Sequence, residues 1–306
     1  MAGIVALSGG VGGARFLRGL VDAVDPASVT AIGNVGDDLE VLGLHVSPDL
    51  DSILYALADV ADEDRGWGRA DETWHALKEA GRLGGETWFR LGDRDIGLHL
   101  VRTQALRRGE TLSAVTARLA AAFGVRTTLV PASDARLRTW VETPAGSFPL
   151  QEWFVARGHR DEVDGVHFEG GGEARAGPGV LEALTQAELI LVAPSNPYIS
   201  IWPILAVREI RAALEGRRVP AVAVSPLIGG RAVKGPADRM LSRLAGGTTP
   251  AHVAACYEGL IDALVIDEAD AGSVDGIGLR TVVARTLMRD AAARRALAEV
   301  ALRSAS

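Results

Sequence analysis

Short apolar runs alternate with longer amphipathic stretches along much of the chain. Five runs are rich in Val, Ile, Leu and Ala, and each ends beside Gly, Pro, Asn, Asp or Ser; they are residues 3–7, 29–34, 189–193, 221–225 and 263–266. Such runs are typical of strands buried on both faces of a sheet. Helical patterns lie between many of them, at 14–23, 207–215 and 250–260. This alternation predicts an α/β fold, with a Rossmann-like, mostly parallel sheet and helices on both of its faces.

Two segments interrupt this alternation. Residues 55–124 are helical in composition, with periodic stretches at 73–79 and 111–123. Further along, residues 139–142 and 147–150 flank the turn sequence Pro144-Ala145-Gly146, which indicates a hairpin.

We therefore expect one catalytic unit spanning residues 1–306. Its Rossmann-like core is formed by 1–54 and 180–306, with a helical insertion at 55–124 and a small antiparallel β segment at 125–179. The last stretch, 284–305, is rich in Ala, Arg and Leu and predicts a helix.

Composition narrows the classes of partner and compartment. The chain has 306 residues, of which 48% are apolar and 23% charged, with a formal net charge of −7. This balance gives no general attraction to nucleic acid or to an anionic membrane, so we expect neither as a partner. A single cysteine, Cys256, excludes an internal disulfide and a cysteine zinc cluster, and its helical context indicates a small core residue.

We also expect a cytoplasmic protein without a signal peptide, because no basic region precedes the first apolar run. The longest uncharged run, 189–207, contains three prolines, at 194, 197 and 203, and is a poor membrane span.

The first apolar run leads into a glycine-rich turn, Ser8-Gly9-Gly10-Val11-Gly12-Gly13-Ala14-Arg15, and then into a helical pattern. Glycine lets the backbone approach an anion closely, and a helix N-terminus offers unpaired N–H groups. The turn matches neither a Walker A loop, which needs Gly-Lys-Ser/Thr, nor the dinucleotide fingerprint, because Arg15 stands where that fingerprint has Gly or Ala. A tight turn that binds nothing remains the alternative. We expect a phosphate or diphosphate here.

Acidic residues follow the second predicted strand in two loops, Asn34-Val35-Gly36-Asp37-Asp38 and Ser47-Pro48-Asp49-Leu50-Asp51. Carboxylates beside a phosphate site commonly hold Mg²⁺. Helix capping is the alternative role for Asp38 and Asp51. With the glycine turn nearby, we predict that Asp38 and Asp51 are metal ligands and that Mg²⁺ is the cofactor.

Three later clusters are further candidates. Arg90 and Arg94 fall in a stretch where Asp and Arg alternate, which indicates either salt-linked helix residues or the wall of an anion pocket. Polar residues also follow two predicted strands, as Pro194-Ser195-Asn196-Pro197 and as Ser225-Pro226. Because ligands of parallel sheets bind beyond the carboxyl ends of strands, we predict that both loops line one pocket.

Together, these motifs resemble those of the 2-phospho-L-lactate transferases, which make the deazaflavin coenzyme F-420. The resemblance runs in order from the first strand to about residue 268 and rests on the glycine turn, both acidic loops, Arg65-Gly66-Trp67-Gly68, Leu91-Gly92-Asp93-Arg94-Asp95, Ala193-Pro194-Ser195-Asn196-Pro197 and Ser225-Pro226-Leu227-Ile228-Gly229-Gly230. The form Val11-Gly12-Gly13-Ala14-Arg15-Phe16 is similar to the actinobacterial branch, which is associated with a phosphoenolpyruvyl donor.

The resemblance implies a transfer reaction. A guanosine diphosphate-linked phosphoenolpyruvate or phospholactate would be the donor. The ribityl hydroxyl of Fo (7,8-didemethyl-8-hydroxy-5-deazariboflavin) would attack the distal phosphorus, and GMP would leave. The resemblance also implies a homodimer.

The candidate residues divide by role. Asp51 and Arg90 fall on the family's Fo-contacting positions, although Arg90 replaces the lysine of archaeal members. The expected nucleotide and phosphate contacts are Gly10, Gly12, Gly13, Ala14, Arg15, Ser195, Asn196 and Pro226. The expected catalytic residues are Asp51, Asp38 and Arg94, with Asp51 either on the metal or orienting the hydroxyl.

Two other classes of protein share parts of this pattern. A nicotinamide-dependent Rossmann oxidoreductase would place Asp37 or Asp38 on a ribose. A non-enzymatic regulator that binds nucleotide sugars would share the glycine turn and the Asn-x-x-Asp-Asp loop, but it looks unlike this chain at residues 65–68 and 91–95. Residues alone leave open whether the donor carries enolpyruvate or lactate.

Overall fold

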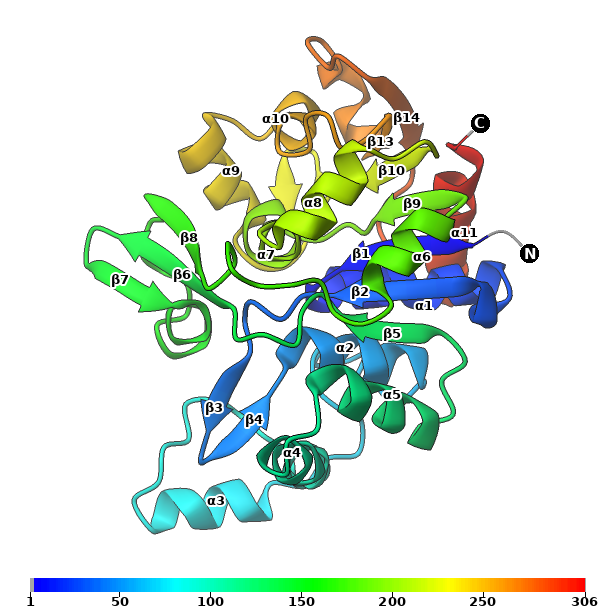
Figure 1. Cartoon of the computed structure of the whole chain (residues 1–306). Helices are drawn as coiled ribbons and strands as arrows, with labels where there is room; N and C mark the ends of the chain where they lie inside the picture. The colour runs from blue at the N-terminus through cyan, green and yellow to red at the C-terminus, as the bar shows by residue number, and fades with distance from the viewer. Residues whose placement is uncertain (1–2, 306) are drawn as a thin grey trace.

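A computed structural model describes residues 3–305, and its centre is a sheet of seven parallel strands (Figure 1). The order across this sheet is β14-β13-β10-β9-β1-β2-β5. The strands are β1 (Ile4–Ser8), β2 (Val29–Gly33), β5 (Thr128–Pro131), β9 (Leu189–Val192), β10 (Ala221–Val224), β13 (Ala263–Asp267) and β14 (Arg280–Ala284). Because β1 lies between β2 and β9, the chain winds outward from β1 in both directions. This is the doubly wound α/β arrangement that the sequence predicts.

Helices cover both faces of the sheet (Figure 1). Helix α1 (Gly10–Ala23) packs against α2 (Pro48–Leu57) and α11 (Ala291–Arg303) on one face. Helices α6 (Val180–Gln186) and α8 (Arg208–Glu215) pack together on the other. The helices lie on opposite faces because each β-α-β crossover is right-handed and the two halves of the sheet wind in opposite directions from β1. The remaining helices are α3 (His75–Arg82), α4 (Asp93–Arg107), α5 (Leu112–Ala122), α7 (Trp202–Leu205), α9 (Ala237–Ala245) and α10 (Pro250–Ala255).

The five predicted strands are confirmed to within one residue at each end. The edge strand β14 is not among the predicted strands, and β5, which falls in the segment expected to be antiparallel, instead pairs parallel with β2 at the other edge of the sheet. β14 occupies residues 280–284, so the predicted C-terminal helix from 284 is wrong at its start; the helix begins at Ala291. β14 lies at one edge of the sheet and is only half-buried. Its pattern therefore lacks the continuous apolar run by which the central strands were recognised.

Smaller sheets join this core. The two acidic loops are connected by the hairpin β3 (Leu39–Val41) and β4 (Leu44–Val46). The expected antiparallel segment is present as β7-β6-β8, formed by β6 (Arg138–Thr143), β7 (Gly146–Pro149) and β8 (Gly165–Glu169). Residues 227–228 and 231–232 form a further two-stranded pair, β11 (Leu227–Ile228) and β12 (Arg231–Ala232).

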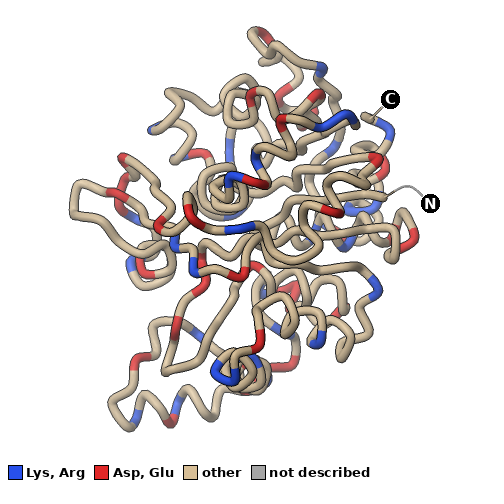
Figure 2. The backbone as a smooth tube through the Cα atoms, in the orientation of Figure 1, with Lys and Arg blue, Asp and Glu red and all other residues tan. Residues whose placement is uncertain are grey.

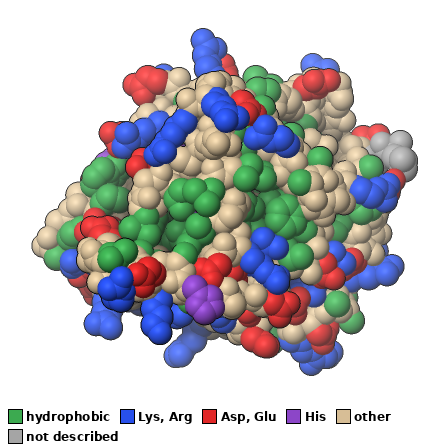
Figure 3. Space-filling view, turned by 90° about the horizontal axis from the view of Figure 1, so that it is seen from below, with side chains coloured by type: hydrophobic (Ala, Val, Ile, Leu, Met, Phe, Trp, Pro, Cys, Tyr) green, Lys and Arg blue, Asp and Glu red, His purple; other side chains and the backbone are tan. Residues whose placement is uncertain are grey.

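Acidic and basic residues are interspersed along the chain, as the coloured positions of the backbone in Figure 2 show. Hydrophobic side chains also reach the surface seen in Figure 3. In the insertion, Leu83, Leu100 and Val101 are exposed. Singly exposed apolar side chains are ordinary on folded proteins, so they mark no site by themselves.

Candidate active site

The glycine turn lies at the point where the strand order reverses. The hydroxyl of Ser195, just beyond β9, donates a hydrogen bond of 2.7 Å to the carbonyl of Gly9, just beyond β1. The N–H of Gly9 donates back to the same hydroxyl oxygen at 3.4 Å. These bonds join the two central turns, and the crevice beyond such a switch point is where doubly wound proteins bind ligands.

Close packing explains why glycine is required at positions 12 and 13. A Cβ on Gly12 would lie 2.7 Å from the carbonyl oxygen of Pro194, and one on Gly13 would lie 2.4 Å from Ser8 Oγ and 2.6 Å from Ser195 Oγ. No side chain fits at these distances. At Gly10 the reason is the backbone conformation: its φ of +65° lies in the left-handed region, which glycine adopts without a steric penalty. The turn therefore brings α1 against the Pro194–Ser195 loop, in addition to any role in binding.

The start of α1 determines which backbone groups are available to an anion. Val11 and Gly12 lie in the first turn, where helix geometry leaves N–H groups without an intrahelical partner. Gly13 and Ala14 come one step later, where the N–H bonds to the preceding turn. The N–H of Gly10 already donates to the carboxylate of Asp49. The donors best placed for a phosphate are therefore Val11 and Gly12.

Buried carboxylates gather at this helix end. The Nδ2 of Asn34 donates to Asp49 Oδ2 at 2.9 Å and lies 3.5 Å from Asp37 Oδ1, while Gln151 Nε2 donates to Asp37 Oδ2 at 2.9 Å. Burial, reinforced by the neighbouring carboxylates, raises the pKa of Asp37 well above its usual value. Burial likewise raises the pKa of Asp49 to about 6. We call the cluster of Asp37, Asp38 and Asp49 the acidic corner; burial disfavours the charged form of Asp37 and Asp49 within it.

Asp38 lies in the same cluster, and one of its oxygens is without a partner. Its Oδ2 accepts a hydrogen bond from Ser47 Oγ at 2.9 Å and lies 3.0 Å from His45 Nε2. Its Oδ1 is buried and contacts no hydrogen-bond donor within the described chain. A buried, unpaired carboxylate oxygen is costly unless a cation or donor completes it.

Asp51 faces a different partner. Both of its carboxylate oxygens accept hydrogen bonds from the guanidinium of Arg102, and the Oδ2 bond measures 3.0 Å. His99 Nδ1 lies 3.8 Å from the same carboxylate, and burial lowers the pKa of this histidine to about 4. The carboxylates of Asp38 and Asp51 therefore have different hydrogen-bond partners, although both act electrostatically on Arg102.

The expected Mg²⁺ would need carboxylate oxygens that are free to bind it. Among residues 3–305, no three His, Cys, Asp or Glu side chains form a ready-made metal site. Mg²⁺ at phosphate sites commonly takes one or two carboxylates and completes its shell with water and substrate oxygens. The free Oδ1 of Asp38 fits such a site. Asp51 would fit only if its bonds to Arg102 rearranged.

Arg90 belongs to an aromatic cluster of the insertion. Its guanidinium lies 4.6 Å from the ring centre of Trp74 and 5.9 Å from that of Trp67. Trp67 and Arg15 both line a cavity of about 270 Å³ between α1, α2 and the loop at 59–68. Arg94, by contrast, is exposed in the first turn of α4, and no contact joins it to the acidic corner.

The late loops are only partly open to a ligand. Asn196 uses its Oδ1 to cap Tyr198, at 3.0 Å from the backbone N–H. Pro226 is half-buried in the loop after β10. The N–H groups of Gly229 and Gly230, a little further on, already donate to Asp270 at 3.0 and 2.8 Å. The second glycine pair is therefore occupied by the protein's own carboxylate.

Arg138, on β6, is a candidate that the sequence reasoning missed. Its guanidinium is half-buried near Asp37 and Asp38, and burial lowers its pKa. Arg102 was missed as well. Each is an isolated arginine in a helix or strand pattern, so nothing in the local sequence distinguishes it from a solvated surface residue.

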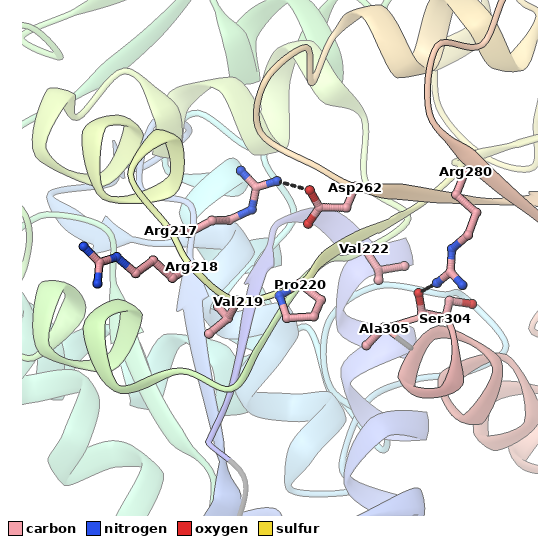
Figure 4. Close-up of a pocket in the computed structure, with 9 residues that line it drawn as sticks. All are labelled: Arg217, Arg218, Val219, Pro220, Val222, Asp262, Arg280, Ser304 and Ala305. Carbon is pink, nitrogen blue, oxygen red and sulfur yellow. Dashed lines mark hydrogen bonds and ion pairs between the residues drawn. The ribbon is translucent and has the colours of Figure 1, made fainter.

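A larger cavity, of about 600 Å³, lies at the other end of the strands (Figure 4). Arg217 in its wall donates to Asp262 at 2.8 Å, and Arg280 donates to the carbonyl of Ser304. Arg218 points away from these groups in Figure 4. Because it opens at the amino ends of the strands, and two of its arginines bind the protein itself, this cavity is not the candidate site.

The fold and the corner at its switch point define a doubly wound, Rossmann-like α/β protein. The chain belongs to the family described as 2-phospho-L-lactate transferase CofD, whose model matches residues 4–280, and it is a transferase. This assignment favours a transferase over the oxidoreductase and the non-enzymatic regulator. In the part of the chain that the structure describes, no helix has the length and hydrophobicity needed to span a membrane.

Similar proteins extend over nearly the whole chain. The phosphoenolpyruvate transferase of Streptomyces griseus subsp. griseus is 44% identical over 308 residues, covering 98% of this chain and 97% of the relative. That of Kitasatospora aureofaciens is 43% identical over 309 residues, covering 98% and 96%. A crystal structure of a UPF0052 family member from Bacillus halodurans shares the fold, with a TM-score of 0.66, 18% identity and 98% of each chain covered.

Proposed function

We propose that this transferase moves a phosphoenolpyruvyl or 2-phospho-L-lactyl group from a guanosine diphosphate-linked donor to the ribityl hydroxyl of Fo, in the biosynthesis of coenzyme F-420. The names of the actinobacterial relatives favour the phosphoenolpyruvyl donor. The structural observation that carries the proposal is the free, buried Oδ1 of Asp38 at the switch point. This oxygen would provide a metal ligand beside a helix N-terminus suited to a diphosphate.

The donor would lie across the carboxyl ends of the central strands. The N–H groups of Val11 and Gly12 would bind its diphosphate, and the loops at Ser195, Asn196 and Pro226 would contact the guanosine. Mg²⁺, when bound at Asp38, would neutralise charge on the phosphate oxygens. The transfer itself needs positioning and charge neutralisation more than covalent catalysis.

The acceptor would enter from the side of the insertion. The cavity of about 270 Å³ has the aromatic wall of Trp67 and the cation of Arg15. The guanidinium of Arg90 lies 5.9 Å from the ring centre of Trp67, and Arg90 remains the second expected contact. Asp51 is one turn of α2 away from Tyr55, which also lines the cavity. A flat, polar heterocycle suits such a wall.

Bond changes in the proposed reaction are simple. The ribityl oxygen forms a bond to the distal phosphorus, and the bond from that phosphorus to the bridging oxygen breaks. GMP leaves with the bridging oxygen. Asp51 would orient the hydroxyl and accept its proton, because carboxylate oxygens held by Arg102 retain free lone pairs. Arg94 remains a predicted source of positive charge, although its side chain is exposed.

The experiment that tests this function mixes purified protein, Fo, Mg²⁺ and each synthetic guanylyl donor, and identifies products by mass spectrometry. We expect GMP and a phosphodiester of Fo, with a loss of product when EDTA is added. Asp51→Asn should reduce turnover by about 100-fold or more, as expected for loss of a general base. Retained turnover in Asp51→Asn would remove that residue from the mechanism, and the absence of product from both donors would reject the function.

A further inference from the structure

Arg138 is held against the acidic corner by the packing of β6 on the first acidic loop. The N–H of Thr139 donates to the carbonyl of Gly36 at 2.6 Å. A Cβ on Gly36 would lie 2.6 Å from Thr139 Oγ1 and 2.8 Å from Leu137 Cδ2, so the loop and the strand are in the closest possible contact. Leu137 and Thr139 are buried in this contact. Arg138 lies between them in the chain, and the charges of Asp38 and Asp37 act on its half-buried guanidinium.

Among residues 3–305, the Arg138 guanidinium donates no side-chain hydrogen bond and forms no ion pair within 4.0 Å, although the charges of Asp38, Asp37 and Glu169 act on it from further away. Glu169 on β8 is directly opposite it in the strand register. The Glu169 carboxylate nevertheless accepts from Trp140 Nε1, at 3.0 Å, instead of pairing with the arginine. Arg138 is half-buried and carries five N–H donors in a planar fork. A partly desolvated fork of this kind suits a planar, bidentate anion.

Strand order decides which part of the donor would reach this arginine. Along the carboxyl edge of the sheet, β10 and β9 lie on one side of β1, and β2 lies on the other. In the proposed function, the guanosine occupies the β9 and β10 side and the diphosphate lies at β1. The group beyond the distal phosphate must then extend past β2. Gly36, which contacts β6, follows β2 directly.

From this placement, and on the basis of the proposed function, we propose that Arg138 binds the carboxylate of the three-carbon acid carried on the donor's distal phosphate. Its fork would bind both carboxylate oxygens. Arg138 would thus be a specificity residue, which distinguishes a donor that carries a carboxylic acid from a plain guanosine diphosphate. It takes no part in the bond changes.

The test compares two ligands on the same protein in the presence of Mg²⁺ and without Fo, so that no transfer occurs. Calorimetry measures the affinity of GDP, which lacks the three-carbon acid, and of the guanylyl donor. Arg138→Leu should weaken donor binding by roughly 10- to 100-fold, the usual effect of losing a charge-assisted hydrogen-bond pair, and should change GDP binding by less than about twofold. Arg138→Lys should recover part of the donor affinity, because it keeps the charge without the fork.

Arg136→Leu is the matched control, since Arg136 is an exposed arginine two residues away. It should leave both affinities unchanged. An equal loss of GDP and donor affinity in Arg138→Leu would show that Arg138 binds the diphosphate or supports the fold, and would overturn the proposal. Unchanged donor binding would overturn it too. A wild-type protein that binds neither ligand would instead reject the proposed function, and this inference with it.

Discussion

The hydroxyl of Ser195 and the carbonyl of Gly9 are joined by a hydrogen bond of 2.7 Å between the ends of β9 and β1. The bond spans 186 positions in the chain and lies where the two halves of the sheet diverge. Any ligand at the switch point meets both turns together, so the packing that supports this bond is a first target for mutation.

Gly13→Ala should destabilise the protein. The added Cβ would lie 2.4 Å from Ser8 Oγ and 2.6 Å from Ser195 Oγ, and the residue is buried, so the two turns would have to separate. Overpacking of this kind costs about 1–3 kcal/mol. The free energy of unfolding from denaturant titration measures it. Gly97→Ala is the control, because that exposed glycine of α4 has nothing within 4 Å of the new methyl group and the change should be neutral or stabilising. Equal losses in both variants would contradict the packing argument.

Arg102→Leu should be more severe. It leaves the buried Asp51 carboxylate without the guanidinium that binds both of its oxygens. Breaking a buried pair in this way costs about 3–5 kcal/mol. Chemical denaturation gives the value, and Arg102→Lys should recover part of it. If Arg102→Leu unfolds no more easily than the wild type, the pair is not a stabilising element of this fold.

The acidic corner should make stability fall as pH rises. The pKa of Asp49 is raised from 3.8 to about 6 in the folded chain, chiefly by burial, so the folded state holds a proton that the unfolded state has released. Its stabilising contribution is present below pH 4 and is lost between about pH 4 and pH 6. Asp37 acts in the same direction.

Asp49→Asn should therefore be more stable than the wild type at pH 7, by about 3 kcal/mol, because each tenfold change in proton affinity is worth about 1.4 kcal/mol. The difference should vanish near pH 4, where the carboxyl is protonated in the folded chain. Unfolding measured at pH 4, 5, 6 and 7 tests this. Asp275→Asn, at an exposed position, is the control and should show no such trend. A stability difference between Asp49→Asn and the wild type that is the same at pH 4 and at pH 7 would contradict the prediction.

Asp38→Asn should raise the Mg²⁺ requirement of the transfer reaction by about tenfold or more, because the amide removes the charge of a carboxylate that has a free buried oxygen. Stability should change little, since an amide oxygen still accepts from Ser47. The measurement is initial rate against Mg²⁺ concentration. An unchanged Mg²⁺ dependence would move the metal away from Asp38.

Trp67→Leu should raise the KM for Fo by about tenfold, as expected for loss of a stacking surface worth about 0.5–1.5 kcal/mol together with its buried area. Binding of GDP should be unaffected, because Trp67 lies on the insertion side, in the cavity with Arg15. Steady-state kinetics and GDP calorimetry separate the two effects. Loss of GDP affinity with unchanged KM for Fo would assign the cavity to the donor instead.

The amino-acid pattern was sufficient for the fold class and for the central strands. β1, β9, β10 and β13 are buried on both faces, so their sequences are continuous apolar runs that can be recognised without neighbours. The edge strands β5 and β14 have partly exposed patterns. β14 was therefore not recognisable as a strand, and β5 was recognisable as β structure but not as a parallel strand of the main sheet. The family was also recognisable, because its motifs are local and occur in order.

The partners of the charged side chains were not recognisable in this way. Asp38 lies in the loop before β3 and Asp51 in the first turn of α2, yet these two aspartates differ: one keeps a free oxygen and the other is bound by Arg102. Arg102 comes from α4 in the insertion, and Arg138 comes from β6. No local sequence pattern around these arginines indicates that one binds Asp51 or that the other lies near the acidic corner.

The sequence alone thus determined the doubly wound sheet, the glycine turn and the family, since hydrophobic periodicity and short motifs are properties of consecutive residues. The tertiary structure alone decided which carboxylate is free, which is paired, and which arginine faces the acidic corner. The reason is physical: the energy of a buried charge depends on the groups that surround it in space, and here those groups come from distant parts of the chain.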